Sequence, residues 1–165
     1  MTKRAIVPVI VGGGQETGLR SGTENMIGIA GFAAAAKVGR ATVGADVAKM
    51  QALSDRLIAG LADSEIRVNL PAVRAPHIVS ITLPNIKSET MLHYLAAKGL
   101  SVSSGSACSS HAKGASPTLL AFGLTVAEAD CTLRVSLSAG NSEAAVDALL
   151  AALRAGCESL VRIRR

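Results

Sequence analysis

Two short stretches alternate between apolar and polar residues over most of their length, and this alternation limits the possible fold most. They are residues 77–83 and 132–137. A period of two is typical of a strand that buries only one face. Both stretches are therefore predicted to be strands of a sheet with one apolar and one polar side. The apolar positions are Val79, Ile81, Leu83, Leu133, Val135 and Leu137.

Helical patterns surround these strands. Apolar residues recur at spacings of three and four in residues 45–62 and from residue 142 onward, which predicts two amphipathic helices. Residues 26–38 are predicted to be a separate alanine-rich helix, with a break between Gly39 and Gly44. Ser88 is predicted to cap a helix over residues 88–98. Shorter strands are expected at 5–11, 66–70 and 100–103, and short helices at 117–122 and 126–130.

Interleaved strands and helices without repeats predict an α/β fold of the α+β type. We expect a small sheet of about four strands covered by helices. A hydrophobic share of 49% and a charged share of 18% exclude a disordered chain.

The composition also limits the possible partners. Aromatic residues are few and the net charge of +5 is scattered, so base-stacking nucleic-acid modules are disfavoured. The apolar runs are short and interrupted, which predicts neither a signal peptide nor a membrane span. Three cysteines without paired spacing predict neither a disulfide framework nor a metal site. We expect a cytoplasmic protein.

Residues 101–113 form a serine-rich stretch around Cys108. No large neighbour is available locally to bury this thiol, and serine and glycine favour turns. We interpret the stretch as a loop that presents a reactive thiol, which His111 and Lys113 could assist. The alternative is a small residue in a serine-rich turn. Cys131 and Cys157 are predicted to be structural.

Two further sites could bind anions. Residues 12–25 are glycine-rich and end at a predicted helix start that Ser21 or Thr23 would cap, which suits a phosphate. A glycine-rich turn without a ligand is equally compatible, and Arg20 could bind an anion or only decorate the loop. Arg134 lies on the polar side of its strand, where a bidentate carboxylate is its best partner. An internal ion pair or a solvated sheet face would also satisfy it.

These motifs together resemble those of the cysteine desulfurases, pyridoxal-phosphate enzymes of the class-V aminotransferase group. The likeness rests on the sequences GGGQE and LRSGTEN before residue 26, SSGSACSS around Cys108 and LRVSL around Arg134. It implies the C-terminal domain of the fold-type I transferase fold. Residues 1–25 would be a remaining segment of the large cofactor domain, and 26–165 the small domain with a mobile cysteine loop at 101–113.

The resemblance also implies residue roles. Cys108 would take sulfur from L-cysteine as a persulfide, leaving L-alanine, and could transiently ligate a nascent iron–sulfur cluster. Arg134 would hold the substrate carboxylate. Thr23 would reach the phosphate of pyridoxal 5'-phosphate in the other subunit of a homodimer. The sulfur would pass to an acceptor protein for iron–sulfur cluster or thio-cofactor assembly.

The chain departs from the family pattern at Thr17, where arginine is frequent. The family's Schiff-base lysine would lie upstream of Met1, so the isolated chain is expected to be inactive. Two alternatives remain: a non-catalytic sulfur-carrier or interaction module, and a selenocysteine lyase that uses the same thiol.

Overall fold

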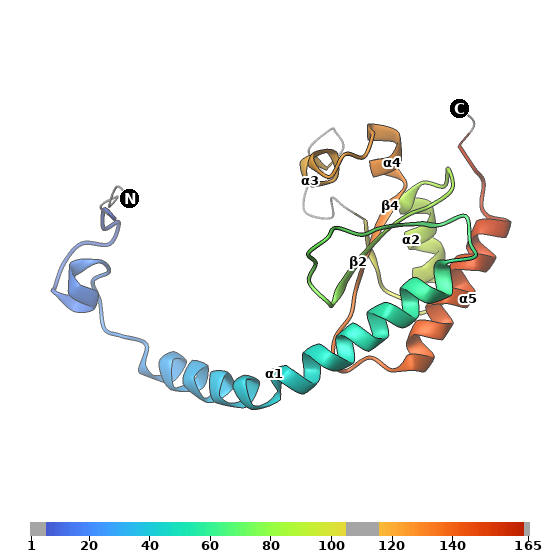
Figure 1. Cartoon of the computed structure of the whole chain (residues 1–165). Helices are drawn as coiled ribbons and strands as arrows, with labels where there is room; N and C mark the ends of the chain where they lie inside the picture. The colour runs from blue at the N-terminus through green and yellow to red at the C-terminus, as the bar shows by residue number, and fades with distance from the viewer. Residues whose placement is uncertain (1–5, 105–115, 164–165) are drawn as a thin grey trace. The chain divides into compact units, whose positions relative to one another are not determined.

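The computed structural model describes residues 6–104 and 116–163. By its internal contacts the chain divides into two compact units, Met1–Val43 and Gly44–Arg165 (Figure 1). The second unit holds the sheet, and the first holds a glycine-rich segment and the beginning of a long helix. Helix α1 (Met26–Leu61) runs from the first unit into the second.

The sheet of the second unit has four antiparallel strands in the order β1-β2-β4-β3. The central pair, β2 (Ile78–Thr82) and β4 (Thr132–Ser136), was predicted from its alternation and is confirmed. The outer strands are short: β1 (Arg67–Asn69) pairs with β2, and β3 (Ser103–Ser104) pairs with β4. The expected small four-stranded sheet covered by helices is therefore confirmed.

Three helices cover the apolar face of this sheet. They are the C-terminal part of α1, α2 (Ser88–Ala96) and α5 (Glu143–Ser159). Figure 1 shows α2 and α5 side by side, and the two helices are in contact. Arg56 of α1 joins Asp147 of α5 through a two-bond ion pair at 2.7 and 2.8 Å. The core is aliphatic and includes Leu57, Leu61, Val79, Ile81, Met91, Leu95, Leu133, Val135 and Leu153.

Two short helices precede β4. They are α3 (Pro117–Ala121) and α4 (Val126–Asp130). Thr125 and Glu128 form a capping box, in which each side chain accepts a hydrogen bond from the other residue's backbone N–H. This box determines where α4 begins and therefore where the chain enters β4.

The first unit is mostly loop before α1. A short 3₁₀ turn spans Gln15–Gly18, and Glu16 and Thr17 within it have positive φ of 50° and 55°. Ser21 closes the loop, because its N–H binds Ile10 O at 3.1 Å and its hydroxyl donates to Gly13 O at 2.8 Å. The strand predicted at 5–11 is wrong over residues 6–11, which are not in a strand. A strand needs a backbone partner, and this segment is not paired with another strand of the described chain.

Three predictions about the helices are also wrong. Gly39 and Gly44 do not interrupt α1, because helical glycine costs only about 1 kcal/mol relative to alanine and the flanking residues are largely strong helix formers. Asn25, and not Ser21 or Thr23, caps α1, since its Oδ1 accepts the Gly28 N–H at 3.0 Å. Ser88 is inside α2, whose N-cap position is Lys87 without a side-chain cap.

Helix α1 is longer and more continuous than its sequence indicated. By length and composition alone it could cross a membrane, contrary to the expectation of short, interrupted runs. The apolar window that passes this test is not buried, and a single helix of this kind is weak evidence of a membrane span. Leu53, Leu57 and Leu61 at its C-terminal end pack into the core of the second unit.

Candidate anion-binding site on the polar face of the sheet

The polar face of the sheet carries one row of side chains that crosses all four strands. The antiparallel register pairs Asn69 of β1 with Ser80 of β2, Ser80 with Arg134 of β4, and Arg134 with Ser103 of β3. Cross-strand partners in register lie on the same face of a sheet. The row therefore has four residues, of which Arg134 is the single cation and the other three are neutral hydrogen-bonding residues.

A pocket of about 370 Å³ lies over this row. Its polar lining includes Asn69, Ser80 and Arg134. Its apolar lining includes Val73, Leu119 and Phe122, which come from the segment after β1 and from α3 and its end. A cation, neutral donors and an apolar wall together suit a small anion with a short apolar body.

Arg134 is exposed, and within residues 6–104 and 116–163 it forms no ion pair. Arg74, the other arginine of the pocket, is engaged elsewhere. Its guanidinium donates to Ser54 Oγ at 2.6 Å and to Asp55 Oδ1 at 2.9 Å. The internal ion pair considered for Arg134 is thus not present among the described residues, and its guanidinium can donate two parallel hydrogen bonds to a carboxylate.

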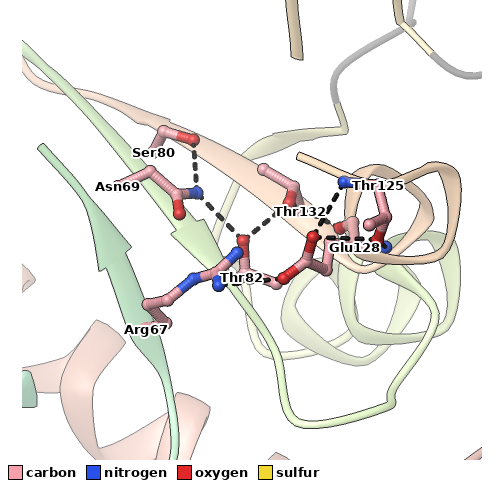
Figure 2. Close-up of polar contacts among 7 residues, drawn as sticks. All are labelled: Arg67, Asn69, Ser80, Thr82, Thr125, Glu128 and Thr132. Carbon is pink, nitrogen blue, oxygen red and sulfur yellow. Dashed lines mark hydrogen bonds and ion pairs between the residues drawn. The ribbon is translucent and has the colours of Figure 1, made fainter. Parts of the chain in front are cut away.

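A chain of hydrogen bonds holds one side of the row in place (Figure 2). Asn69 Nδ2 donates to Ser80 Oγ at 3.1 Å and to Thr82 Oγ1 at 2.9 Å. The hydroxyls of Thr82 and Thr132 lie 2.8 Å apart, and Thr132 donates to the Glu128 carbonyl at 2.7 Å. Thr82 and Thr132 are buried. The loss of one of these hydrogen bonds would leave a buried hydroxyl without a partner, which costs folding free energy.

The Glu128 carboxylate stabilises the same corner. The backbone N–H and then the hydroxyl of Thr125 lower the pKa of Glu128 to about 2. Partial burial opposes that shift, and Arg67, whose Nη1 lies 2.9 Å from Glu128 Oε1, adds to it. The carboxylate therefore stays ionised at neutral pH and connects α4 to β1.

Thr23 lies in the first unit and Arg134 in the second. The Thr23 side chain is exposed and has no hydrogen bond within the described residues. An exposed hydroxyl just before a helix start is a suitable donor to a phosphate. The Thr23 side chain therefore fits the cofactor phosphate that it is expected to hold. The Gly28 N–H at the helix start already donates to Asn25.

Cys108 lies outside the described residues, with His111 and Lys113. The segment that contains them joins Ser104, which pairs with Leu133, to Ser116, which lines the pocket. The structural role predicted for Cys131 and Cys157 stays a prediction, and their burial supports it. Cys131 is buried, and Cys157 packs half-buried against the core, where burial raises the pKa of its thiol.

Ser80 and Asn69 were not predicted as site residues. The alternation in residues 77–83 placed Ser80 on a polar face, but many exposed strand residues have that pattern. Their proximity to Arg134 follows only from the strand order and register. The pairing of β2 with β4 joins Ser80 to a residue that is far away in sequence.

Comparison with known proteins covers almost all of the chain. The family model for "Aminotransferase class-V" matches residues 9–149. Cysteine desulfurase IscS 1 of Archaeoglobus fulgidus is 39% identical over 93% of this chain and 41% of its own length. Cysteine desulfurase IscS of Clostridium botulinum is 37% identical over 88% and 38%. The chain thus spans about 40% of the length of these curated relatives.

Solved structures agree with this result. The NifS-like protein of Rickettsia africae superposes with a TM-score of 0.76 at 30% identity, over 92% of this chain and 40% of its own. The aminotransferase TlmJ of Streptoalloteichus hindustanus, at 16% identity and a TM-score of 0.57, shares the fold over 76% of this chain and 35% of its own. The family model matches well over half of the residues. The chain therefore belongs to the class-V aminotransferase family.

Proposed function

We propose that the chain is part of a pyridoxal-phosphate-dependent cysteine desulfurase. One structural observation carries the proposal: Arg134 lies exposed in a pocket lined by neutral donors and apolar side chains, with no ion pair among the described residues. The identity to two cysteine desulfurases supports L-cysteine as the amino acid whose carboxylate Arg134 binds.

In the proposed reaction, Arg134 holds the carboxylate of L-cysteine in two parallel hydrogen bonds. The Cys108 thiolate attacks the sulfur of the bound substrate, so that a sulfur–sulfur bond forms and the substrate carbon–sulfur bond breaks. The electron pair of the broken bond stays with the substrate carbon, which is protonated to give L-alanine. When bound, pyridoxal phosphate supplies the electron sink that stabilises negative charge on the substrate.

The proposed cofactor contact within this chain is the Thr23 hydroxyl, which would donate to the phosphate. The proposed homodimer would bring this hydroxyl to the cofactor of the other subunit. Apolar side chains exposed along α1 support an assembly in which another protein surface covers this stretch. They are Met26, Ile27, Ile29, Phe32, Val38 and Val43.

We further propose that the Cys108 persulfide passes to an acceptor protein of iron–sulfur cluster or thio-cofactor assembly in the cytoplasm. The described residues on both sides of segment 105–115 lie at this site, because Ser103 pairs with Arg134 and Ser116 lines the pocket, which supports transfer from this pocket. A thiol that receives sulfur at one place and delivers it at another has to reach both places.

The test uses the protein encoded by the entire open reading frame that contains this chain. It is incubated with pyridoxal phosphate and L-cysteine, and alanine, sulfide and the sulfur adduct of Cys108 are measured. We expect alanine formation that Cys108→Ala abolishes and Cys157→Ala preserves, because Cys157 is packed on α5. Alanine formation that survives Cys108→Ala would refute the nucleophile.

The same assay separates the alternatives when a second desulfurase or L-selenocysteine is supplied. A sulfur adduct on Cys108 acquired from a second desulfurase, without cofactor absorbance, would indicate a sulfur carrier. Strong preference for L-selenocysteine would indicate a lyase for that substrate. The 165-residue chain by itself is expected to form no alanine, and turnover that depends on its Cys108 would contradict this expectation.

A further inference from the structure

The bonds around Asn69 determine which way each hydroxyl proton points. Thr132 has one hydroxyl proton and donates it to the Glu128 carbonyl at 2.7 Å. Of the two threonine hydroxyls that lie 2.8 Å apart, Thr82 must therefore be the donor and Thr132 the acceptor. With its proton committed to Thr132, Thr82 can only accept from Asn69.

The orientation of the Asn69 amide follows from this. Asn69 must present its NH₂ group, and not its carbonyl oxygen, to Thr82. The second hydrogen of that group is donated to Ser80 Oγ at 3.1 Å. Ser80 is thus an acceptor toward Asn69, and its own hydroxyl proton is left for another partner. Within the described residues Ser80 donates no side-chain hydrogen bond.

Ser80 is also the direct cross-strand partner of Arg134 and lines the same pocket. Its remaining proton and the Arg134 guanidinium therefore belong to adjacent residues on one face of the sheet. Figure 2 shows Ser80 at the end of the hydrogen-bond chain that runs through Asn69 and Thr82 to Thr132. Asn69 donates in both directions, to Ser80 at the pocket and to Thr82, from which the donation continues through Thr132 to the Glu128 carbonyl of α4.

We propose that the Ser80 hydroxyl is a second donor to the carboxylate that Arg134 binds, and that Asn69 keeps Ser80 in the donating state. Ser80 would then be a ligand-binding residue and Asn69 a positioning residue. The inference rests on the proposed function, because it assumes that Arg134 binds a carboxylate. A hydroxyl beside the guanidinium favours a planar oxyanion over a chloride ion, since two donors in different directions match its two oxygens.

The experiment uses propanoate as the probe and the full 165-residue chain. The Arg134 Nε–Hε signal is followed by NMR at constant ionic strength with chloride as counter-ion, and Arg134→Lys assigns the signal. A hydrogen bond to a charged partner is worth enough that its loss should weaken propanoate binding about ten-fold. We expect that loss in Ser80→Ala and near wild-type affinity in Ser80→Thr, which keeps the hydroxyl.

Ser136→Ala is the matched control, because Ser136 is an exposed serine on the same face of β4 that does not line the pocket. It should bind propanoate like wild type. Asn69→Asp should weaken binding, because Ser80 would then donate to the new carboxylate. Backbone amide spectra confirm that each variant is folded.

The outcomes distinguish the inference from the proposed function. Ser80→Ala with unchanged affinity, while propanoate still shifts the Arg134 signal, would overturn the role of Ser80 and leave that of Arg134 intact. Propanoate that does not perturb Arg134 in the wild-type chain would overturn the carboxylate site itself. Equal loss in Ser80→Ala and Ser80→Thr would also refute hydroxyl donation.

Discussion

The hydrogen bond between Thr82 and Thr132 should be measurable as a coupling energy in a double-mutant cycle. Thr132→Val removes two side-chain bonds, one from Thr82 and one to the Glu128 carbonyl. Thr82→Val also removes two, one to Thr132 and one from Asn69. At about 0.5–1.5 kcal/mol per bond, each single variant should lose about 1–3 kcal/mol of unfolding free energy.

The double variant should lose less than the sum of the two single variants. The sum of the two single losses counts four hydrogen bonds. Thr82 and Thr132 take part in only three, because the bond between them is counted twice. The shortfall should therefore equal one bond, about 0.5–1.5 kcal/mol. Thr132 is 2% exposed and Thr82 7%, so water cannot readily replace the missing partner.

Urea unfolding followed by circular dichroism measures these differences, provided that the m value is unchanged. Thr132→Val combined with Ser136→Ala is the control cycle, because Ser136 and Thr132 share a face of β4 without a hydrogen bond between them. The control should be additive. Additivity within about 0.3 kcal/mol in the Thr82–Thr132 cycle would refute the bond and the proton direction deduced from it.

Three further predictions concern other parts of the second unit. Hydrogen bonds from Thr125, with a smaller contribution from Arg67, lower the pKa of Glu128 from 4.5 to about 2. This carboxylate therefore stabilises the fold above about pH 4.5, and the contribution is lost as pH falls toward 2. Glu128→Gln should flatten the pH dependence of the unfolding free energy in this window, and an unchanged slope would contradict the shift. Gly156→Ala should lower the melting temperature, because the new Cβ would lie 2.7 Å from Met91 Cε and Sδ. Gly44→Ala should raise the melting temperature instead, because there is open space around the new Cβ. Because burial raises the pKa of the Cys157 thiol, iodoacetamide should modify Cys157 slowly at neutral pH and rapidly in urea, and equal rates would show that the thiol is not packed.

The elements that could be predicted from the sequence are those with strong local signals. The alternation of apolar and polar residues located β2 and β4. Ser142 before an apolar stripe located the start of α5, which the Ser142 side chain caps. Glycine was a weaker guide. Gly39 and Gly44 lie inside α1 because its flanking helix formers outweigh their modest cost.

The candidate site was only partly predictable for a physical reason. Arg134 stands out locally, as a charge in the middle of an alternating strand. Ser80 and Asn69 become site residues only because β2 pairs with both β1 and β4, and β4 lies far from the other two strands in sequence. The strand order β1-β2-β4-β3 is not readable from local patterns, because it depends on how the whole core packs.

The alternation along β4 also separates two kinds of selection on neighbouring residues. Leu133 and Val135 are buried in the core, whereas Arg134 between them is exposed and adds nothing to that core. A library that randomises residues 133–135 should therefore show two independent tolerances. Positions 133 and 135 should accept only apolar side chains of similar volume, whatever the ligand, and position 134 should diversify freely in a screen for folding but converge on arginine in a screen for carboxylate binding.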